Sequence, residues 1–268
     1  MKTAEISKVG VGIATVDARR SEFARLLLAE VHALFQRDPD IPSIIGMGNG
    51  SFEGPADLLA NVLASAATSA RNTDLVRKHA RSVFSSDAQA LGAALDDIAV
   101  TARKNFEPGG ITTTLLFSRG IHALLAHRVT HSLWNEGRRD LALALKTLFG
   151  RAFSTDIHPA ARFGNGIWLD HGLGFVVGET AAIGDDVSIW HGVTLGSTLK
   201  DNSDQRHPRI GRGTTIGADA ILLGGIDIGS GSVIAAGSIV LVDVEPGTTV
   251  AGVPAKPKAR TETSFAGF

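Results

Sequence analysis

Two patterns of hydrophobic residues divide the chain. In the first half, apolar residues recur at three- and four-residue spacing in segments rich in Ala and Leu, which predicts amphipathic helices. We expect these helices at 21–36, 56–71, 74–103, 114–135 and 138–149. Turn-forming residues separate them at 39–42, 46–55 and 107–110. The pattern predicts an α-helical domain over residues 1–150.

The second half carries a six-residue period. From Ile210 to Val240 an aliphatic residue recurs at every sixth position, and the same period runs through 157–169 and 177–195. A period of six matches neither an α-helix nor a simple strand. It is typical of coils of about 18 residues, each made of three short strands whose every sixth side chain points to the axis. We therefore predict a parallel β-helix of hexapeptide repeats over 151–258, followed by a tail.

Composition narrows the classes of function. The 26 Lys and Arg residues nearly balance the 27 Asp and Glu residues, which argues against a nucleic-acid or membrane-surface partner. The chain has no Cys, so disulfides, thiolate metal sites and a cysteine nucleophile are excluded. No segment approaches the roughly 18 apolar residues of a membrane span, and the N-terminus lacks the apolar core of a signal peptide. We expect a soluble, cytoplasmic protein.

The hexapeptide period breaks twice, and each break contains a His next to a charged residue. The first break is a two-residue slip at Asp170-His171, and the second is a long interruption that contains Arg206-His207. Insertions in a solenoid emerge as loops on one face, which is commonly the binding face. A His is a natural general base for an alcohol, and a guanidinium binds a carboxylate through two parallel hydrogen bonds. Asp156 lies somewhat less than one coil before His171, so we expect these two side chains to pair.

Motifs at and around these breaks resemble serine O-acetyltransferases, the hexapeptide-repeat acyltransferases of cysteine biosynthesis. The resemblance is carried by DIHPAARFGNGIWLDHGLGFVVGET (156–180), VTLG (193–196), RHPRIG (206–211) and AGVPAK (251–256). The helical stretch 117–139 is also similar to that family.

The resemblance implies a left-handed β-helix that transfers acetyl from acetyl-CoA to the hydroxyl of L-serine, giving O-acetyl-L-serine. His171 would be the general base, and Asp156 would orient it. Asp170 would contact the substrate amino group, while Arg206 and His207 would bind its carboxylate. Direct attack on the thioester needs no covalent intermediate, which fits the absence of Cys.

The resemblance also implies where the co-substrate lies and how chains assemble. Small residues would let coenzyme A approach the backbone at Gly196, Ser197, Ala218, Ala236 and Gly237. No metal is expected. Family members form trimers, often paired into hexamers through the helical domains. Asp170 and His171 of one chain would then face Arg206 and His207 of its neighbour.

Three features depart from the family pattern. One is the loop 196–209, which has Ser197, Leu199 and Asn202-Ser203 where the family usually has a Gly-rich run. Asn105 stands where the family usually has an Asp that holds the substrate amino group, and Glu107 offers a carboxylate two residues later. A related amino alcohol, such as homoserine or a modified serine, therefore stays open as the acceptor. The tail 259–268 ends in Phe268 rather than the Ile with which many members enter O-acetylserine sulfhydrylase, which argues against that partner.

The sequence also leaves open two functions of a different class from acetyl transfer. A γ-type carbonic anhydrase would use the same trimeric β-helix with zinc held by histidines, and this chain has candidates in His158, His171, His191 and His207. A non-catalytic assembly subunit would keep the trimer alone. His122, His127 and His131 share one predicted helix without a carboxylate in register, so we interpret them as packed or surface histidines.

Overall fold

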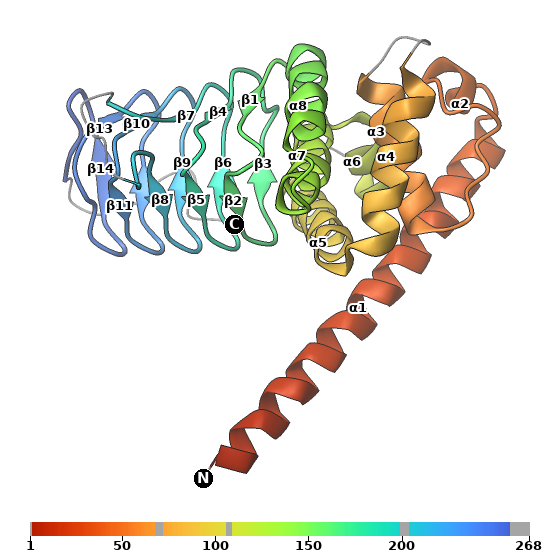
Figure 1. The fold of residues 1–268 in the computed structure, drawn as a ribbon, viewed down its shortest axis with the longest axis horizontal. Helices are drawn as coiled ribbons and strands as arrows, with labels where there is room; N and C mark the ends of the chain where they lie inside the picture. Colours follow the sequence, from red (N-terminus) through yellow and green to blue (C-terminus); the bar gives the residue numbers. More distant parts are fainter. Residues whose placement is uncertain (1, 68–71, 106–108, 199–203, 258–268) are drawn as a thin grey trace.

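The computed structural model describes residues 2–67, 72–105, 109–198 and 204–257, in which a group of helices is followed by a column of short strands (Figure 1). The helices are α1 (Lys2–Arg37), α2 (Ile41–Ile44), α3 (Pro55–Ala67), α4 (Thr73–Ser86), α5 (Ala88–Lys104), α6 (Gly110–Phe117), α7 (Arg119–Asn135) and α8 (Arg139–Phe153). The predicted order of a helical region and a parallel β-helix is confirmed.

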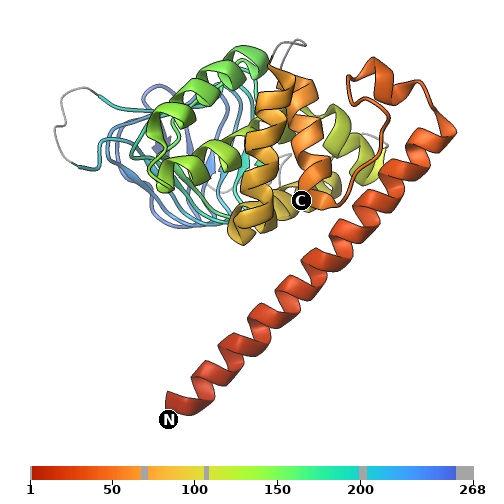
Figure 2. The same cartoon turned by 45° about the vertical axis from the view of Figure 1, so that its right-hand side comes forward.

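The helix boundaries differ from the predicted ones, and three of the differences are large. The predicted helix at 74–103 is two helices, because Asp87 leaves the helical conformation (ψ 95°) and its carboxylate accepts hydrogen bonds from the N–H groups of Gln89 and Ala90. The predicted helix at 114–135 is also divided, at Ser118, where ψ is 114° and the side chain makes no capping hydrogen bond. Helix α1 begins at Lys2, well before the predicted start, and projects away from the rest of the chain (Figure 2). Apolar periodicity continues across the two breaks, so it does not reveal them.

The strands form three parallel sheets, one on each side of the β-helix. The first sheet contains β1 (Asp156–Ile157), β4 (Val176–Val177), β7 (Thr194–Gly196), β10 (Ile221–Leu223) and β13 (Ile239–Val240). The second contains β2 (Arg162–Phe163), β5 (Ala182–Ile183), β8 (Arg209–Ile210) and β11 (Asp227–Ile228). The third contains β3 (Trp168–Leu169), β6 (Ser188–Ile189), β9 (Thr215–Ile216), β12 (Val233–Ile234) and β14 (Thr249–Ala251), and β15 (Lys256–Pro257) is added antiparallel to β14.

The six-residue period corresponds to the side chains that fill the axis. In the first sheet the register aligns Ile157, Val177, Leu195, Leu222 and Val240. All five are at most 6% exposed. Because each coil stacks its own aliphatic on the one below, the repeat builds a continuous hydrophobic column.

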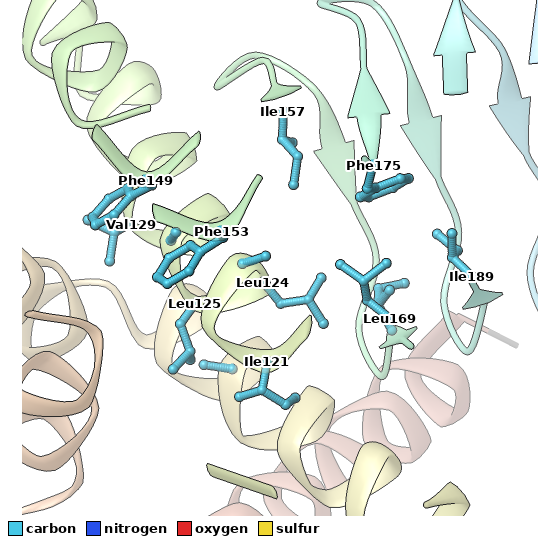
Figure 3. Packing of buried hydrophobic residues seen from close by; sticks show 14 of the residues in the cluster. Ile121, Leu124, Leu125, Val129, Phe149, Phe153, Ile157, Leu169, Phe175 and Ile189 are labelled. Carbon is cyan, nitrogen blue, oxygen red and sulfur yellow. The ribbon is translucent and has the colours of Figure 1, made fainter. Parts of the chain in front are cut away.

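Helices α7 and α8 cover the end of this column (Figure 3). Leu124 and Phe153 from these helices share one buried cluster with Ile157, Leu169 and Phe175 of the first coils. The helical core and the β-helix core are therefore continuous, which fixes the helices relative to the first coil.

Two edges of the β-helix matter for the site. The corners that lead from the third sheet to the first are 170–175, 190–193, 217–220 and 235–238, and we call them the His171 edge. Among the described residues, the corners that lead from the first sheet to the second are 158–161, 178–181, 197–198 with 204–208, and 224–226, and we call them the Arg206 edge. The strands of the first sheet separate the two edges.

Candidate active site

A pocket of about 180 Å³ lies where helix α5 and the α6–α7 junction meet the His171 edge. Three of the predicted site residues, Asn105, Asp170 and His171, line it together. Its other lining residues are Thr101, Thr113, Phe117, Ser118, Arg119, Trp168, Leu169 and Leu173. The volume is below the roughly 300–1,000 Å³ of pockets for drug-sized ligands, so it suits a small polar molecule such as an amino acid.

His171 is held in an unusual backbone conformation. Its φ is 58°, in the left-handed region that a residue with a Cβ seldom adopts. The corner is closed by Gly172, whose N–H donates to the Asp170 carbonyl at 2.6 Å, and by Gly174, whose N–H donates to the Ser154 carbonyl at 2.7 Å. The His171 side chain is 63% exposed and its Nε2 lies 3.6 Å from an oxygen of the Asp170 carboxylate. A strained backbone that presents an accessible imidazole beside a pocket is a typical feature of functional sites.

Asp156 does not pair with His171 as its spacing suggests. Its carboxylate, at the start of β1, forms an ion pair with the ammonium group of Lys146 on α8. The side chain points outward and is 60% exposed, so a nearby positive charge is a stronger partner for it than an imidazole one corner away. In this structure the acidic group beside His171 is Asp170.

Arg206 and His207 lie on the Arg206 edge, where Thr180 organises their backbone. The N–H groups of both residues donate to Thr180 Oγ1 at 3.1 Å, and the Arg206 guanidinium forms an ion pair with the Glu179 carboxylate. The imidazole of His207 is 8% exposed and lies against Gly178, where an added Cβ would collide with the ring.

Burial, and then the charge of Arg206, lower the pKa of His207, which favours its neutral form. Its Nδ1 accepts a hydrogen bond from the Thr180 N–H at 3.3 Å. This bond assigns the ring proton to Nε2, which leaves Nε2 as a donor for a ligand.

The two groups of predicted residues are apart in one chain. Asp170 and His171 occupy one side of the first sheet, and Arg206 and His207 occupy the other side. The predicted coenzyme residues divide in the same way, since Ala218, Ala236 and Gly237 lie on the His171 edge and Gly196 and Ser197 lie at the Arg206 edge.

Comparison with known proteins places this geometry in a family. The family model described as bacterial transferase hexapeptide (six repeats) matches residues 207–241. Serine acetyltransferase of Salmonella typhimurium is 47% identical over 199 residues, which are 74% of this chain and 71% of that protein. The chain belongs to the serine acetyltransferase family.

Two further relatives support the serine acetyltransferase assignment. Serine acetyltransferase 2 of Arabidopsis thaliana is 57% identical over 145 residues, although the match spans only 54% of this chain and 45% of that protein. The structure of soybean serine acetyltransferase complexed with serine is 40% identical, with a TM-score of 0.82 over 89% of this chain and 98% of that chain. The fold class is accordingly α+β, with an N-terminal helical domain before a left-handed parallel β-helix of hexapeptide repeats.

The remaining expectations concern two residues outside the described ranges, a metal site, a membrane span and the helical histidines. Glu107 and Phe268 lie outside the described residues. Within the described ranges, no three His, Asp or Glu side chains are close enough to hold a metal ion. In the same ranges, no helix is long and apolar enough to cross a membrane. His122 and His127 are buried, as expected for packed histidines.

Sequence reasoning missed several residues around the site. Glu179 and Thr180 belong to the VVGET motif, but their contacts with Arg206 and His207 cross the long interruption, so spacing offered no signal. Thr101 was missed because it comes from a helix rather than from the repeat.

Proposed function

We propose that this chain transfers the acetyl group of acetyl-CoA to the hydroxyl of L-serine. The observation that carries the proposal is the pocket that brings Asn105, Asp170 and His171 together in a chain of the serine acetyltransferase family. The serine complex of the soybean relative supports L-serine as the acceptor.

In this proposal His171 removes the proton from the acceptor hydroxyl as that oxygen attacks the thioester carbonyl. A new C–O bond forms, the C–S bond breaks, and the coenzyme leaves as a thiol after taking up the proton. Asp170 accepts hydrogen bonds from the acceptor ammonium group, and Asn105 lies on the same wall. Asp156 orients His171 once it turns from Lys146 toward the corner.

Arg206 and His207 bind the acceptor carboxylate, and they come from a neighbouring chain. Their position supports this step, because one chain holds them on the opposite side of the first sheet from His171. The proposal therefore includes a trimer through the β-helix, with residues 1–150 as the oligomerisation domain and 151–258 as the acetyltransferase domain. Coenzyme A would lie between chains, between the His171 edge of one and the Gly196 and Ser197 corner of the next.

The test measures release of coenzyme A from acetyl-CoA with L-serine, D-serine, L-homoserine, L-threonine or no acceptor. Preference for L-serine supports the proposal as stated. A clear preference for L-homoserine would mean that Asn105 marks a changed acceptor on the same catalytic centre. Equal release with and without acceptor would contradict acetyl transfer.

The base is tested by His171→Ala. Removal of a general base typically lowers kcat about 10²- to 10⁴-fold, with the fold unchanged because His171 is 63% exposed. The matched control is His79→Ala on α4, a half-buried histidine far from the pocket along the chain. Wild-type turnover in His171→Ala would show that another group is the base.

A further inference from the structure

We propose that His191 is a positioning residue that holds the imidazole of His171 in its reactive orientation. This inference rests on the proposed function, in which His171 is the base. His191 lies in the corner between β6 and β7, on the next coil of the His171 edge.

The register brings the two histidines onto neighbouring coils. Leu169 is aligned with Ile189 in the third sheet, so His171 and His191 each lie two residues beyond an aligned pair, although the corner of His171 is two residues longer. Their ring centroids are 5.9 Å apart with an interplanar angle of 64°, an edge-to-face arrangement. This lies within the 4.5–7 Å range in which aromatic rings attract each other. The same position on the following coils is held by Ala218 and Ala236, which have no ring.

The contact matters because little else holds the His171 ring. The ring is 63% exposed, and its 3.6 Å separation from the Asp170 carboxylate is too long for a hydrogen bond. A side chain as exposed as this rotates about its second torsion unless a neighbour restricts it. The edge-to-face contact with His191 supplies that restriction.

His191 is itself fixed by the two corners beside it. Its carbonyl accepts a hydrogen bond from the Asp219 N–H at 2.9 Å. The next residue, Gly192, donates its N–H at 2.7 Å to the carbonyl of Leu173, in the corner that carries His171. The backbone of His191 is thus tied to the corner that carries His171.

Hydrogen bonding from Nδ1 does not explain the His191 ring. His191 Nδ1 is buried and has no hydrogen-bond partner among the described residues. An unpaired buried nitrogen is unfavourable, and an apolar ring of similar size would avoid that cost. The ring's contact with His171 is the role that the structure assigns to the side chain, and an apolar aromatic ring should therefore preserve it.

The test compares kcat and KM of the full-length chain with those of His191→Ala, His191→Phe and His191→Asn, using the best acceptor from the panel. Loss of the ring should lower kcat about 10-fold or more, since misplacing a catalytic group by about 1 Å costs up to about 100-fold. KM should change less than about twofold, because His191 is not among the residues that line the pocket. His191→Phe should keep kcat within about threefold of wild type, whereas His191→Asn should resemble His191→Ala. His79→Ala serves as the control.

Two results would overturn the proposal. Wild-type kcat in His191→Ala would show that the contact does not position the base. Activity in His191→Asn with loss in His191→Phe would show that a hydrogen bond from position 191, rather than a ring, is needed.

A second readout separates this proposal from the proposed function. With ¹³C-labelled histidine, the Hε1–Cε1 signal of His171 is assigned from its loss in His171→Ala and followed in the His191 variants. The signal should move in His191→Ala, because the ring-current shift from the neighbouring ring is lost. This NMR measurement does not require the chain to be catalytically active. An unchanged signal refutes the ring contact, whereas a shifted signal in a chain that acetylates no acceptor refutes only the proposed function.

Discussion

The buried ion pair between Arg128 and Asp97 makes a strong prediction about stability and the site together. Arg128 on α7 is 6% exposed and Asp97 on α5 is 1% exposed. The guanidinium donates to the Asp97 carboxylate at 2.9–3.1 Å and also to the carbonyls of Phe163 and Gly164 beside β2. Asp97 in turn accepts the N–H of Ile167 at 2.8 Å. Two helices and the first coil of the β-helix are joined through this pair.

Asp97→Asn is the perturbation that isolates the charge. The amide is nearly isosteric with the carboxylate, but its NH₂ group faces the guanidinium donors and leaves the Arg128 charge unpaired. Removing one partner of a buried pair costs about 3–5 kcal/mol in the free energy of unfolding. The neighbouring Asp96→Asn breaks the partly exposed pair with Arg20, for which about 0–1 kcal/mol is expected. The two variants therefore form a matched comparison on one helix.

Urea unfolding at pH 8 provides the measurement. Burial raises the pKa of Asp97 to about 6 against the opposing effect of Arg128, so the carboxylate is ionised at pH 8. The KM for the acceptor should also rise in Asp97→Asn, because Thr101 and Asn105 of the pocket wall come from the same helix or its cap. If Asp97→Asn loses no more stability than Asp96→Asn, the argument that this pair joins the helices to the coil is wrong.

Three further predictions test other parts of the structure. Burial lowers the pKa of His122 to about 4, so the folded chain favours the neutral ring. The unfolded chain takes up a proton below pH 6.5. Stability should therefore fall by about 3 kcal/mol between pH 6.5 and pH 4, and His122→Gln should remove that part of the slope in urea unfolding. Gly178→Ala should displace the His207 ring and raise the KM for the acceptor about 10-fold or more in steady-state kinetics. An unchanged KM would show that His207 does not bind the acceptor carboxylate. Lys104 is half-buried and donates to Ser188 Oγ at 2.6 Å. Lys104→Met should change the free energy of unfolding by less than about 1.5 kcal/mol and raise the KM for the acceptor. An unchanged KM would show that this contact does not position Asn105.

The β-helix was predictable because its core contacts repeat locally. Each inward aliphatic, such as Ile216 or Ile234, needs only the equivalent side chain one coil away, so the fold is encoded in a short period. The two failures of that period fall on the His171 edge and the Arg206 edge. The helical domain was less predictable in detail, since Asp87 and Ser118 end helices by changing backbone conformation within an unbroken apolar pattern.

The side-chain partners at the candidate site were harder to predict from the sequence. Spacing along the chain suggested that Asp156 would contact His171, yet its carboxylate pairs with Lys146 in the middle of α8. The stacking of the coils also determines two other contacts. It brings Glu179 beside Arg206 and the ring of His191 beside that of His171.

Residue periodicity and local motifs thus sufficed to predict the architecture and the family. Hydrophobic burial sets that periodicity. Because the pattern is spread over many residues, an error at a single position does not change the predicted fold. Side-chain partners depend on a single distance of a few ångströms between groups far apart in sequence. Only the packing of helices on coils determined those distances, and with them the pocket, the ion pairs and the contact between His171 and His191.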